Sequence, residues 1–221
     1  AREGVVDAYG HVSIRHPERP DRYILSQSRA PELVERDDLM EYTLEGDPVD
    51  QQGRPMYTER PIHGGIYQAR DDVMAIVHNH SPTVIPFSVT TTPLRPMFHL
   101  AAIIGPELPV WDIHDKFQDT NMLVTNMDQG RDLAACLGDR RVSLMRGHGC
   151  VIAGNTIREV IMASIYLQVN AGLLMESMRL GDVKYLSPGE IKAMTDSQMS
   201  LTGQQRAWEY WANRAERGRG S

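Results

Sequence analysis

Apolar and polar residues along the chain follow two periodicities, and these predict a mixture of helices and strands. The clearest helix begins at a capping box of Thr156 and Glu159 and ends at Gly181. A helix that is apolar on two faces is expected to be buried between layers. Its apolar residues form two stripes, Ile157, Ile161, Ile165, Val169 and Leu173 on one side and Val160, Leu167, Ala171, Leu174 and Met178 on the other.

Shorter elements surround this helix. A second capping box, Ser187 with Glu190, predicts another helix start. Hairpin-type connections outnumber strand–helix–strand units, so we expect an α/β fold in one domain over residues 1–221, with an antiparallel or mixed sheet and helices on its faces. The remaining helices are predicted over residues 61–69, 96–104, 128–137 and 204–217, and strands over residues 12–15, 23–26, 39–44, 73–77, 110–113, 141–145 and 150–153.

Two segments at the ends carry weaker signals. Residues 1–6 are interpreted as the end of a helix that stops at Gly4 and whose earlier turns are missing. Residues 214–221 are interpreted as a polar tail.

Composition narrows the class of protein. The 221 residues are 41% apolar and 24% charged, which is ordinary for a globular chain, and the net charge of −6 argues against a general nucleic-acid binder. No apolar stretch approaches the roughly 18 residues of a membrane span, so we expect neither a transmembrane segment nor a signal peptide. The two cysteines, Cys136 and Cys150, are too few for a disulfide framework, so a cytoplasmic location is expected.

Two histidines end the apolar run before residue 81. His78 and His80 are two positions apart, and side chains at this spacing on a strand point to the same face. Two imidazoles so placed can converge on one metal ion. Two surface histidines beyond the end of a strand would give the same pattern.

A third histidine follows a later predicted strand. His148 lies between Gly147 and Gly149 at a tight hairpin, where the missing side chains let it lean into a cleft. An exposed turn histidine is the alternative. Three histidines with an open fourth position suit a catalytic divalent metal.

One carboxylate stands at the entrance of a predicted helix. Glu59 precedes Pro61, where an acid commonly interacts with the helix dipole. Next to a metal, the same carboxylate could be a ligand or a proton carrier. His63, four residues later, could orient Glu59 or simply pack in the core.

The order of these motifs resembles the class II aldolase and adducin family over about residues 10–180. The resemblance implies a single α/β/α domain around a mainly antiparallel sheet, a homotetramer with active sites near subunit contacts, a divalent metal on His78, His80 and His148, and Glu59 as the catalytic residue. The motifs are Gly10–Arg15, Ile24–Ser26, Thr58-Glu59 with His63, His78–His80 and Gly147–Gly149.

Two departures from the family bear on the substrate. Sugar-phosphate members usually carry Gly-Asn-x-Ser and Thr-x-Ser-Gly loops, whereas this chain has His11 in the first motif and Arg29 at the end of the second. Arginine closes a backbone nest for phosphate and adds a planar cation that binds carboxylate. Arg29 could instead be a solvated loop residue.

The pattern is similar to the decarboxylase branch of the family. That similarity implies a manganese-dependent, non-oxidative loss of CO2 from an ortho-hydroxy aromatic dicarboxylate, most specifically 3-hydroxy-2-methylpyridine-4,5-dicarboxylate of vitamin B6 degradation. Zinc is possible at the same ligands. We expect Glu59 to deliver a proton to the carbon that bears the leaving carboxylate, while the remainder of the substrate is bound by His11, Ser28, Arg29 and Thr58.

Two other functions stay open. A sugar-phosphate aldolase or epimerase would use the same metal, and an adducin-like interaction module would need none of the histidines. The segment around His114 is expected to be a surface loop, with reach to a neighbouring subunit's site as the alternative. Trp208, Tyr210 and Trp211 are expected to pack or to make a subunit contact, with closure of the pocket as the lesser alternative.

Overall fold

The structure, a computed structural model, describes residues 1–198 and 201–217. Its strands form one seven-stranded sheet in the order β3-β2-β1-β4-β7-β6-β5. Every neighbouring pair is antiparallel except β5 and β6, which are parallel. The strands are β1 (His11–Arg15), β2 (Arg22–Ser26), β3 (Leu39–Thr43), β4 (Ala75–Asn79), β5 (Val110–Trp111), β6 (Val142–Met145) and β7 (Gly149–Gly154).

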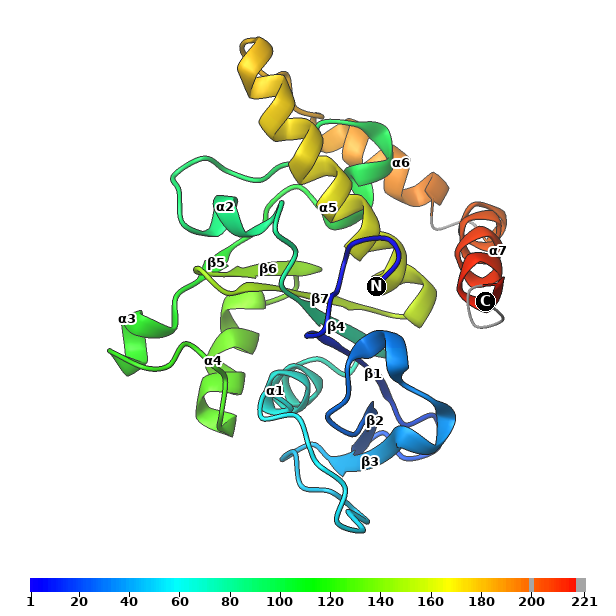
Figure 1. Ribbon diagram of the computed structural model, residues 1–221. Coiled ribbons are helices and arrows are strands. Elements are labelled where there is room, and N and C mark those ends of the chain that lie inside the picture. Colours follow the sequence, from blue (N-terminus) through cyan, green and yellow to red (C-terminus); the bar gives the residue numbers. More distant parts are fainter. Residues whose placement is uncertain (199–200, 218–221) are drawn as a thin grey trace.

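Helices cover both faces of this sheet (Figure 1). The α-helices are α1 (Pro61–Ala69), α2 (Ile85–Ser88), α3 (Ile113–Phe117), α4 (Met127–Leu137), α5 (Ile157–Leu180), α6 (Pro188–Gln198) and α7 (Leu201–Arg217). Short 3-10 helices are η1 (Pro31–Leu33), η2 (Arg36–Asp38) and η3 (His99–Ile104).

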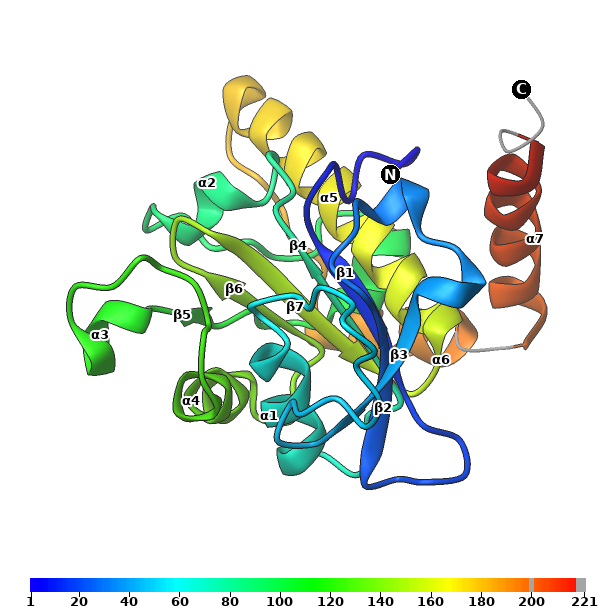
Figure 2. The same ribbon diagram turned by 60° about the horizontal axis from the view of Figure 1, so that its bottom comes forward.

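Two hydrophobic clusters lie between the sheet and the helices on its two faces. Figure 2 shows α1 and α4 on one side of the sheet and α5 on the other. On one face of the sheet, Ile62 and Ile66 of α1 and Leu133 of α4 pack against the inward side chains of β2, β3 and β7. On the other face, Val160 and Leu167 of α5 pack with η3 against β4, β6 and β7. The predicted α/β class, with a mainly antiparallel sheet between helices, is confirmed.

Helices α1 and α4 approach very closely. A Cβ atom added at Gly65 would lie 2.4 Å from the carbonyl carbon of Gly130, and one added at Gly130 would lie 2.2 Å from the carbonyl oxygen of Pro61. Only glycine allows this close approach. The contact between the two helices holds the start of α1, and the turn before it that carries Glu59, against α4.

Residues 1–6 contain one turn, which Gly4 closes, and the interpretation that earlier helical turns precede it stays a prediction. Residues 1–9 form turns and bends, and Gly4 has φ +69 within a turn that it closes on Ala1. This segment is held by contacts with distant elements, because the side-chain amide of Gln168 donates to the carbonyl oxygen of Glu3 and Arg214 forms an ion pair with Glu3. Residues 214–217 belong to α7 and not to a tail, and Arg214 of this last turn forms the ion pair with Glu3; residues 218–221 lie outside the described part.

Two predicted elements are shorter than expected. The helix predicted over residues 96–104 is limited to η3, because Phe98 before it has an extended backbone; the N–H of Met97 donates to Asn170 of α5. The strand predicted over residues 110–113 ends at Trp111, because the Asp112 side chain caps α3 by accepting from the N–H of His114.

The long helix α5 is buried mainly on the face toward the sheet, and α7 contacts it at Tyr166 and Arg158. Its second stripe is buried as predicted, apart from Met178, but in the first stripe Ile157, Val169 and Leu173 are exposed, because the sheet lies on one side of the helix. Among the described helices, α5 alone is long and apolar enough to cross a membrane, with a mean hydropathy of 1.2, although no stretch of this kind was expected. Half of that window is buried inside the fold, as in the core helix of a globular protein.

Candidate functional site

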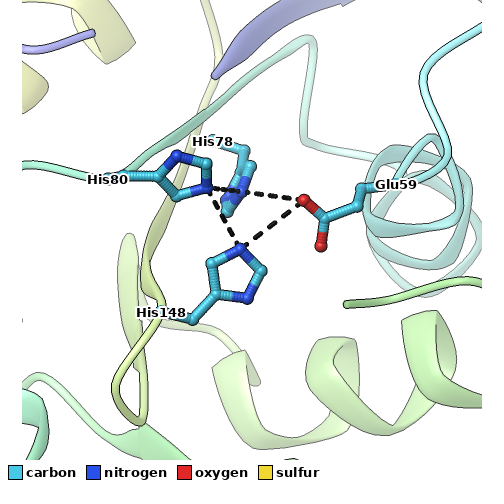
Figure 3. Close-up of side chains that lie close together, drawn as sticks. All are labelled: Glu59, His78, His80 and His148. Atoms are coloured by element: carbon cyan, nitrogen blue, oxygen red, sulfur yellow. Dashed lines mark hydrogen bonds and ion pairs between the residues drawn. The ribbon is translucent and has the colours of Figure 1, made fainter. Parts of the chain in front are cut away.

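Four side chains from three separate parts of the chain meet at the end of strand β4 (Figure 3). His78 is on β4, His80 follows it, His148 is in the turn between β6 and β7, and Glu59 is in the turn before α1. One ligand atom from each lies within 4.8 Å of all the others. The structure therefore brings together the four residues that the sequence suggested for the metal and the proton transfer.

The local backbone explains these positions. β4 ends at Asn79, so His80 lies just beyond the strand and not on it as expected. Gly147 has φ +63 in the turn before His148. A Cβ atom at Gly149 would lie 2.1 Å from the carbonyl oxygen of Asn79, so glycine lets the two segments touch where their histidines meet.

The imidazoles are oriented by backbone carbonyl groups. Nδ1 of His78 donates to the carbonyl oxygen of Cys150 at 3.1 Å, and Nδ1 of His148 donates to that of Met122 at 3.0 Å. Each Nε2 then carries a lone pair, as in metal-binding histidines held by an outer hydrogen bond. Nε2 of His80 lies 3.0 Å and 3.1 Å from the other two.

This arrangement fits a divalent cation. Tetrahedral nitrogen ligands at about 2.1 Å from a metal lie roughly 3.4 Å apart, close to the spacing between these nitrogens. Lone pairs that face one another repel unless a cation or a proton lies between them. Imidazole nitrogen suits zinc and other first-row ions.

Glu59 is held by both of its oxygens. Oε1 accepts from the backbone N–H of Val124 at 3.0 Å, and Oε2 lies 3.5 Å from Nε2 of His78 and of His148. Burial raises the pKa of Glu59, but when protons, in place of a cation, lie on the Nε2 atoms of the two histidines, their hydrogen bonds and charges outweigh burial and leave that pKa far below its ordinary value. Glu59 is therefore a carboxylate in the resting site.

A cavity of about 390 Å³ opens beside this cluster. It has room for an aromatic acid of one ring. Its lining includes every residue expected to bind substrate, His11, Ser28, Arg29 and Thr58, together with Glu59, His80, Tyr57, Leu123 and the segment 8–10.

Arg29 is not simply solvated. Its Nη1 donates to Oδ2 of the buried Asp38 at 2.8 Å, an anchor that the sequence analysis did not anticipate. Hydrogen bonds from Glu35 and Gln27, against the opposing effect of burial, keep the pKa of Asp38 low. The guanidinium is thus fixed by a carboxylate while it lines the cavity.

Tyr57 is the main residue that the sequence analysis missed. Its hydroxyl donates to the carbonyl oxygen of Arg29 and accepts from the N–H of Arg29 and from Ser26, and its ring lies 4.6 Å from that of His11. It therefore ties the loop of Arg29 to the wall of the cavity. Its position just before Thr58 and Glu59 was the only available signal.

His11 and His63 lie next to the cluster and interact with each other. Nδ1 of His11 is 2.6 Å from Nε2 of His63, and the His11 ring is 5.0 Å from that of His78. His63 does not contact Glu59 by a hydrogen bond; its Nδ1 bonds to Ser13. Burial lowers the pKa of His11 well below 6.5, and burial with the charge of His78 lowers the pKa of His63 to about 3.

The other candidate residues lie elsewhere. His114 is exposed on α3 and faces Asp119. Trp211 packs against Tyr166 of α5, and Arg158 lies over Trp208. None of the three C-terminal aromatic residues lines the cavity, so within one chain they do not close it; Trp208 and Trp211 pack as expected, whereas Tyr210 is exposed. Figures 1 and 2 place α3 and α7 at opposite sides of the molecule.

Known proteins are similar to this chain over nearly its whole length. Decarboxylase tropJ from Talaromyces stipitatus is 34% identical to this chain, and the match covers 98% of this chain and 90% of tropJ. 3,4-Dihydroxyphthalate decarboxylase from Arthrobacter keyseri is 27% identical, and the match covers 90% of this chain and 80% of that enzyme. The solved L-fuculose 1-phosphate aldolase from Glaciozyma antarctica PI12 has the same fold, with a TM-score of 0.79, 19% identity, and coverage of 99% of this chain and 84% of that one. The family model for the Class II Aldolase and Adducin N-terminal domain matches residues 1–175, so this chain belongs to the class II aldolase and adducin family.

Proposed function

We propose that this protein is a divalent-metal-dependent carboxy-lyase that removes CO2 from an aromatic acid with a hydroxyl group ortho to the leaving carboxylate. The observation that carries the proposal is that the candidate metal cluster borders the cavity. Glu59 and His80 belong to the cluster and also line the cavity, together with Arg29. The names of the tropJ and 3,4-dihydroxyphthalate decarboxylases support the same reaction class.

The roles of the residues follow from their chemistry. His78, His80 and His148 would hold the ion, which when bound supplies Lewis-acid stabilisation of negative charge on substrate oxygen atoms. Arg29, fixed by Asp38, would bind a second carboxylate in a bidentate pair. Ser28 and Thr58 offer hydroxyl groups at the same wall of the cavity.

Glu59 would move the proton. As a carboxylate, Glu59 accepts the proton of the ortho hydroxyl when substrate binds, and it then donates that proton to the ring carbon bearing the leaving group. The bond from this carbon to the carboxylate breaks, CO2 leaves, and the electron pair returns to the ring and its oxygen. The product oxygen takes one proton from solvent, which balances the reaction.

The proposal also names a substrate, a metal, an assembly and a location. A substrate with two carboxylates uses Arg29 best, and 3,4-dihydroxyphthalate and 3-hydroxy-2-methylpyridine-4,5-dicarboxylate are the two to compare. Manganese is favoured by family resemblance and zinc is the alternative. A homotetramer with sites near its subunit contacts and a cytoplasmic location complete the proposal.

The test measures CO2 release by purified protein loaded with Mn²⁺ or Zn²⁺. The panel contains the two dicarboxylates, their monocarboxylate analogues, fuculose 1-phosphate and ribulose 5-phosphate, and His148→Ala protein is the control. We expect CO2 from the hydroxylated aromatic acids, with a lower KM for the dicarboxylates than for their monocarboxylate analogues, and none from the sugar phosphates. Cleavage or epimerisation of a sugar phosphate without CO2 release would replace the proposal by the aldolase function, and a lack of both metal binding and turnover would favour an interaction module.

A further inference from the structure

A line of buried hydrogen bonds leads from the cavity into the core. It begins at Nδ1 of His11, which is 2.6 Å from Nε2 of His63. Nδ1 of His63 is 2.6 Å from the hydroxyl of Ser13, and that hydroxyl is 2.9 Å from the hydroxyl of Tyr67. All four side chains are at most 5% exposed, so water does not complete these bonds.

The buried Tyr67 end of this line determines which atom donates and which accepts in each hydrogen bond. Tyr67 is fully buried, and within the described residues its hydroxyl has no hydrogen-bond partner besides Ser13. A buried hydroxyl that donates to nothing costs about 1–3 kcal/mol. The proton of Tyr67 must therefore point to the Ser13 oxygen.

The direction of this hydrogen bond determines which atom donates in each of the next two bonds, toward the cavity. The Ser13 hydroxyl, which accepts from Tyr67, uses its own proton to donate to Nδ1 of His63. His63 is then protonated on Nε2 and donates to Nδ1 of His11. His11 keeps its proton on Nε2, because a neutral imidazole has one N–H and one lone pair.

Nε2 is the polar atom that His11 can offer to a ligand. The ring lines the cavity between Tyr57 and His78, with ring centroids 4.6 Å and 5.0 Å away. Nδ1 is occupied by His63, and no described residue bonds to Nε2. An N–H at this place accepts no hydrogen bond and binds an oxygen with lone pairs.

We propose that Tyr67, Ser13 and His63 form a directed hydrogen-bond chain that holds His11 as an Nε2–H donor to an anionic oxygen of the substrate. This inference rests on the proposed function only for the identity of that oxygen, a carboxylate or phenolate of the aromatic acid. His11 would touch substrate, whereas His63, Ser13 and Tyr67 are positioning residues that act through it. The chain also accounts for a histidine where sugar-phosphate relatives have the asparagine of their Gly-Asn-x-Ser motif.

The first test reads the tautomer without any turnover. Zinc-loaded protein labelled with 15N-histidine is examined by NMR, and the His11 signals are assigned by their loss in His11→Asn protein. We expect His11 to show a protonated Nε2 and an unprotonated Nδ1. The opposite pattern would overturn the proposal, whether or not any aromatic acid is decarboxylated.

The second test breaks the chain at its far end. Tyr67→Phe removes the hydroxyl that sets the direction, so the His11 signals should shift toward the other tautomer and KM for the best aromatic acid should rise by roughly tenfold with a smaller change in kcat. Ser13→Ala should act in the same way, and Ser13→Thr, which keeps a hydroxyl, should restore both readouts. Ser13→Ala also replaces Tyr67→Phe if that variant does not fold.

Tyr42→Phe is the matched control. Tyr42 is a fully buried tyrosine of the same hydrophobic cluster, and among the described residues its hydroxyl is hydrogen-bonded only to the sulfur of Met40. It should leave the His11 signals and KM unchanged. Wild-type signals and KM in both Tyr67→Phe and Ser13→Ala would overturn the proposal, whereas the expected tautomer in a protein that releases no CO2 would refute only the proposed function.

Discussion

The Nδ1 of His78 donates a hydrogen bond to the backbone carbonyl oxygen of Cys150, 3.1 Å away on the neighbouring strand β7. A second imidazole, His148, is held in the same way by Met122. Because both partners are backbone carbonyl groups, the fold itself presents the Nε2 lone pairs to one point.

Removing one imidazole should therefore abolish tight metal binding. Loss of an outer hydrogen-bond partner alone typically weakens metal affinity by about 10–100-fold, so His148→Ala should reduce it by more than roughly 100-fold. Competition with a chromophoric chelator measures the affinity for Mn²⁺ and Zn²⁺. His114→Ala, which changes an exposed histidine on α3, is the control. Equal affinities in the two variants would refute the ligand set.

Lysine should replace Arg29 poorly. Arg29→Lys keeps the charge but loses the planar fork, so KM for a dicarboxylate should rise by about tenfold while KM for a monocarboxylate analogue changes little. Steady-state kinetics on the two substrates give the comparison. Arg36→Lys, on the exposed side of η2, should have no effect. An equal rise for both substrates would remove Arg29 from recognition of the second carboxylate.

Substitution of Glu59 by glutamine should separate metal binding from proton transfer. Glu59→Gln has nearly the same shape and retains an acceptor for the N–H of Val124, but it cannot carry the proton. We expect kcat to fall by roughly 10²–10⁴-fold with the metal content unchanged by elemental analysis. A protein with full metal and a normal rate would show that another group moves the proton.

The buried His63 should make stability depend on pH. Burial lowers its pKa to about 3 in the folded protein, whereas it titrates near 6.5 in the unfolded chain. Because the unfolded chain binds the proton first as the pH falls, this contribution to stability is complete above about pH 6.5 and is lost progressively toward pH 3. In metal-free protein, His63→Gln should flatten the dependence of unfolding free energy on pH by about 1.4 kcal/mol per pH unit between roughly pH 6 and pH 4. Urea titrations measure this slope, and His114→Gln should keep the wild-type slope.

The contact between α1 and α4 should not accept a methyl group. Gly130→Ala would place Cβ 2.2 Å from the carbonyl oxygen of Pro61, so we expect a loss of about 1–3 kcal/mol of unfolding free energy. Gly172→Ala in α5 is the control, since its Cβ would meet only Thr83, at 3.9 Å, and it should be neutral or stabilise the protein by up to about 1 kcal/mol. Denaturant unfolding of both variants decides between these outcomes.

Elements with a regular apolar period were predictable from the sequence, and so was the candidate cluster, whose histidines are next to glycines or at a strand end. The predictions failed where the backbone is held by side chains that the apolar period does not show. The N–H of Met97 donates to Asn170, 73 positions away, and the side chain of Asp112 ends β5 by capping α3. Neither contact has a periodic signal in the sequence.

The same reason limits what could be predicted of the site. Arg29 was expected to bind substrate, but its anchor Asp38 is nine residues away and carries no motif. The hydrogen bond between His11 and His63 spans 52 positions, and its partners Ser13 and Tyr67 look like ordinary core residues in the sequence. The backbone carbonyl groups that orient His78 and His148 have no sequence signal at all.

Strand β4 is the middle member of the sheet, bordered by β1 and β7. Its amide protons are thus expected to exchange with deuterium only through opening of the whole domain, since no edge can fray to release it. His78 is expected to be equally protected from opening, whereas Glu59 and His148 lie in turns and His80 lies in the loop that follows β4. A metal ion would then bind and dissociate through movements of Glu59, His80 and His148, while the imidazole of His78 stays in place.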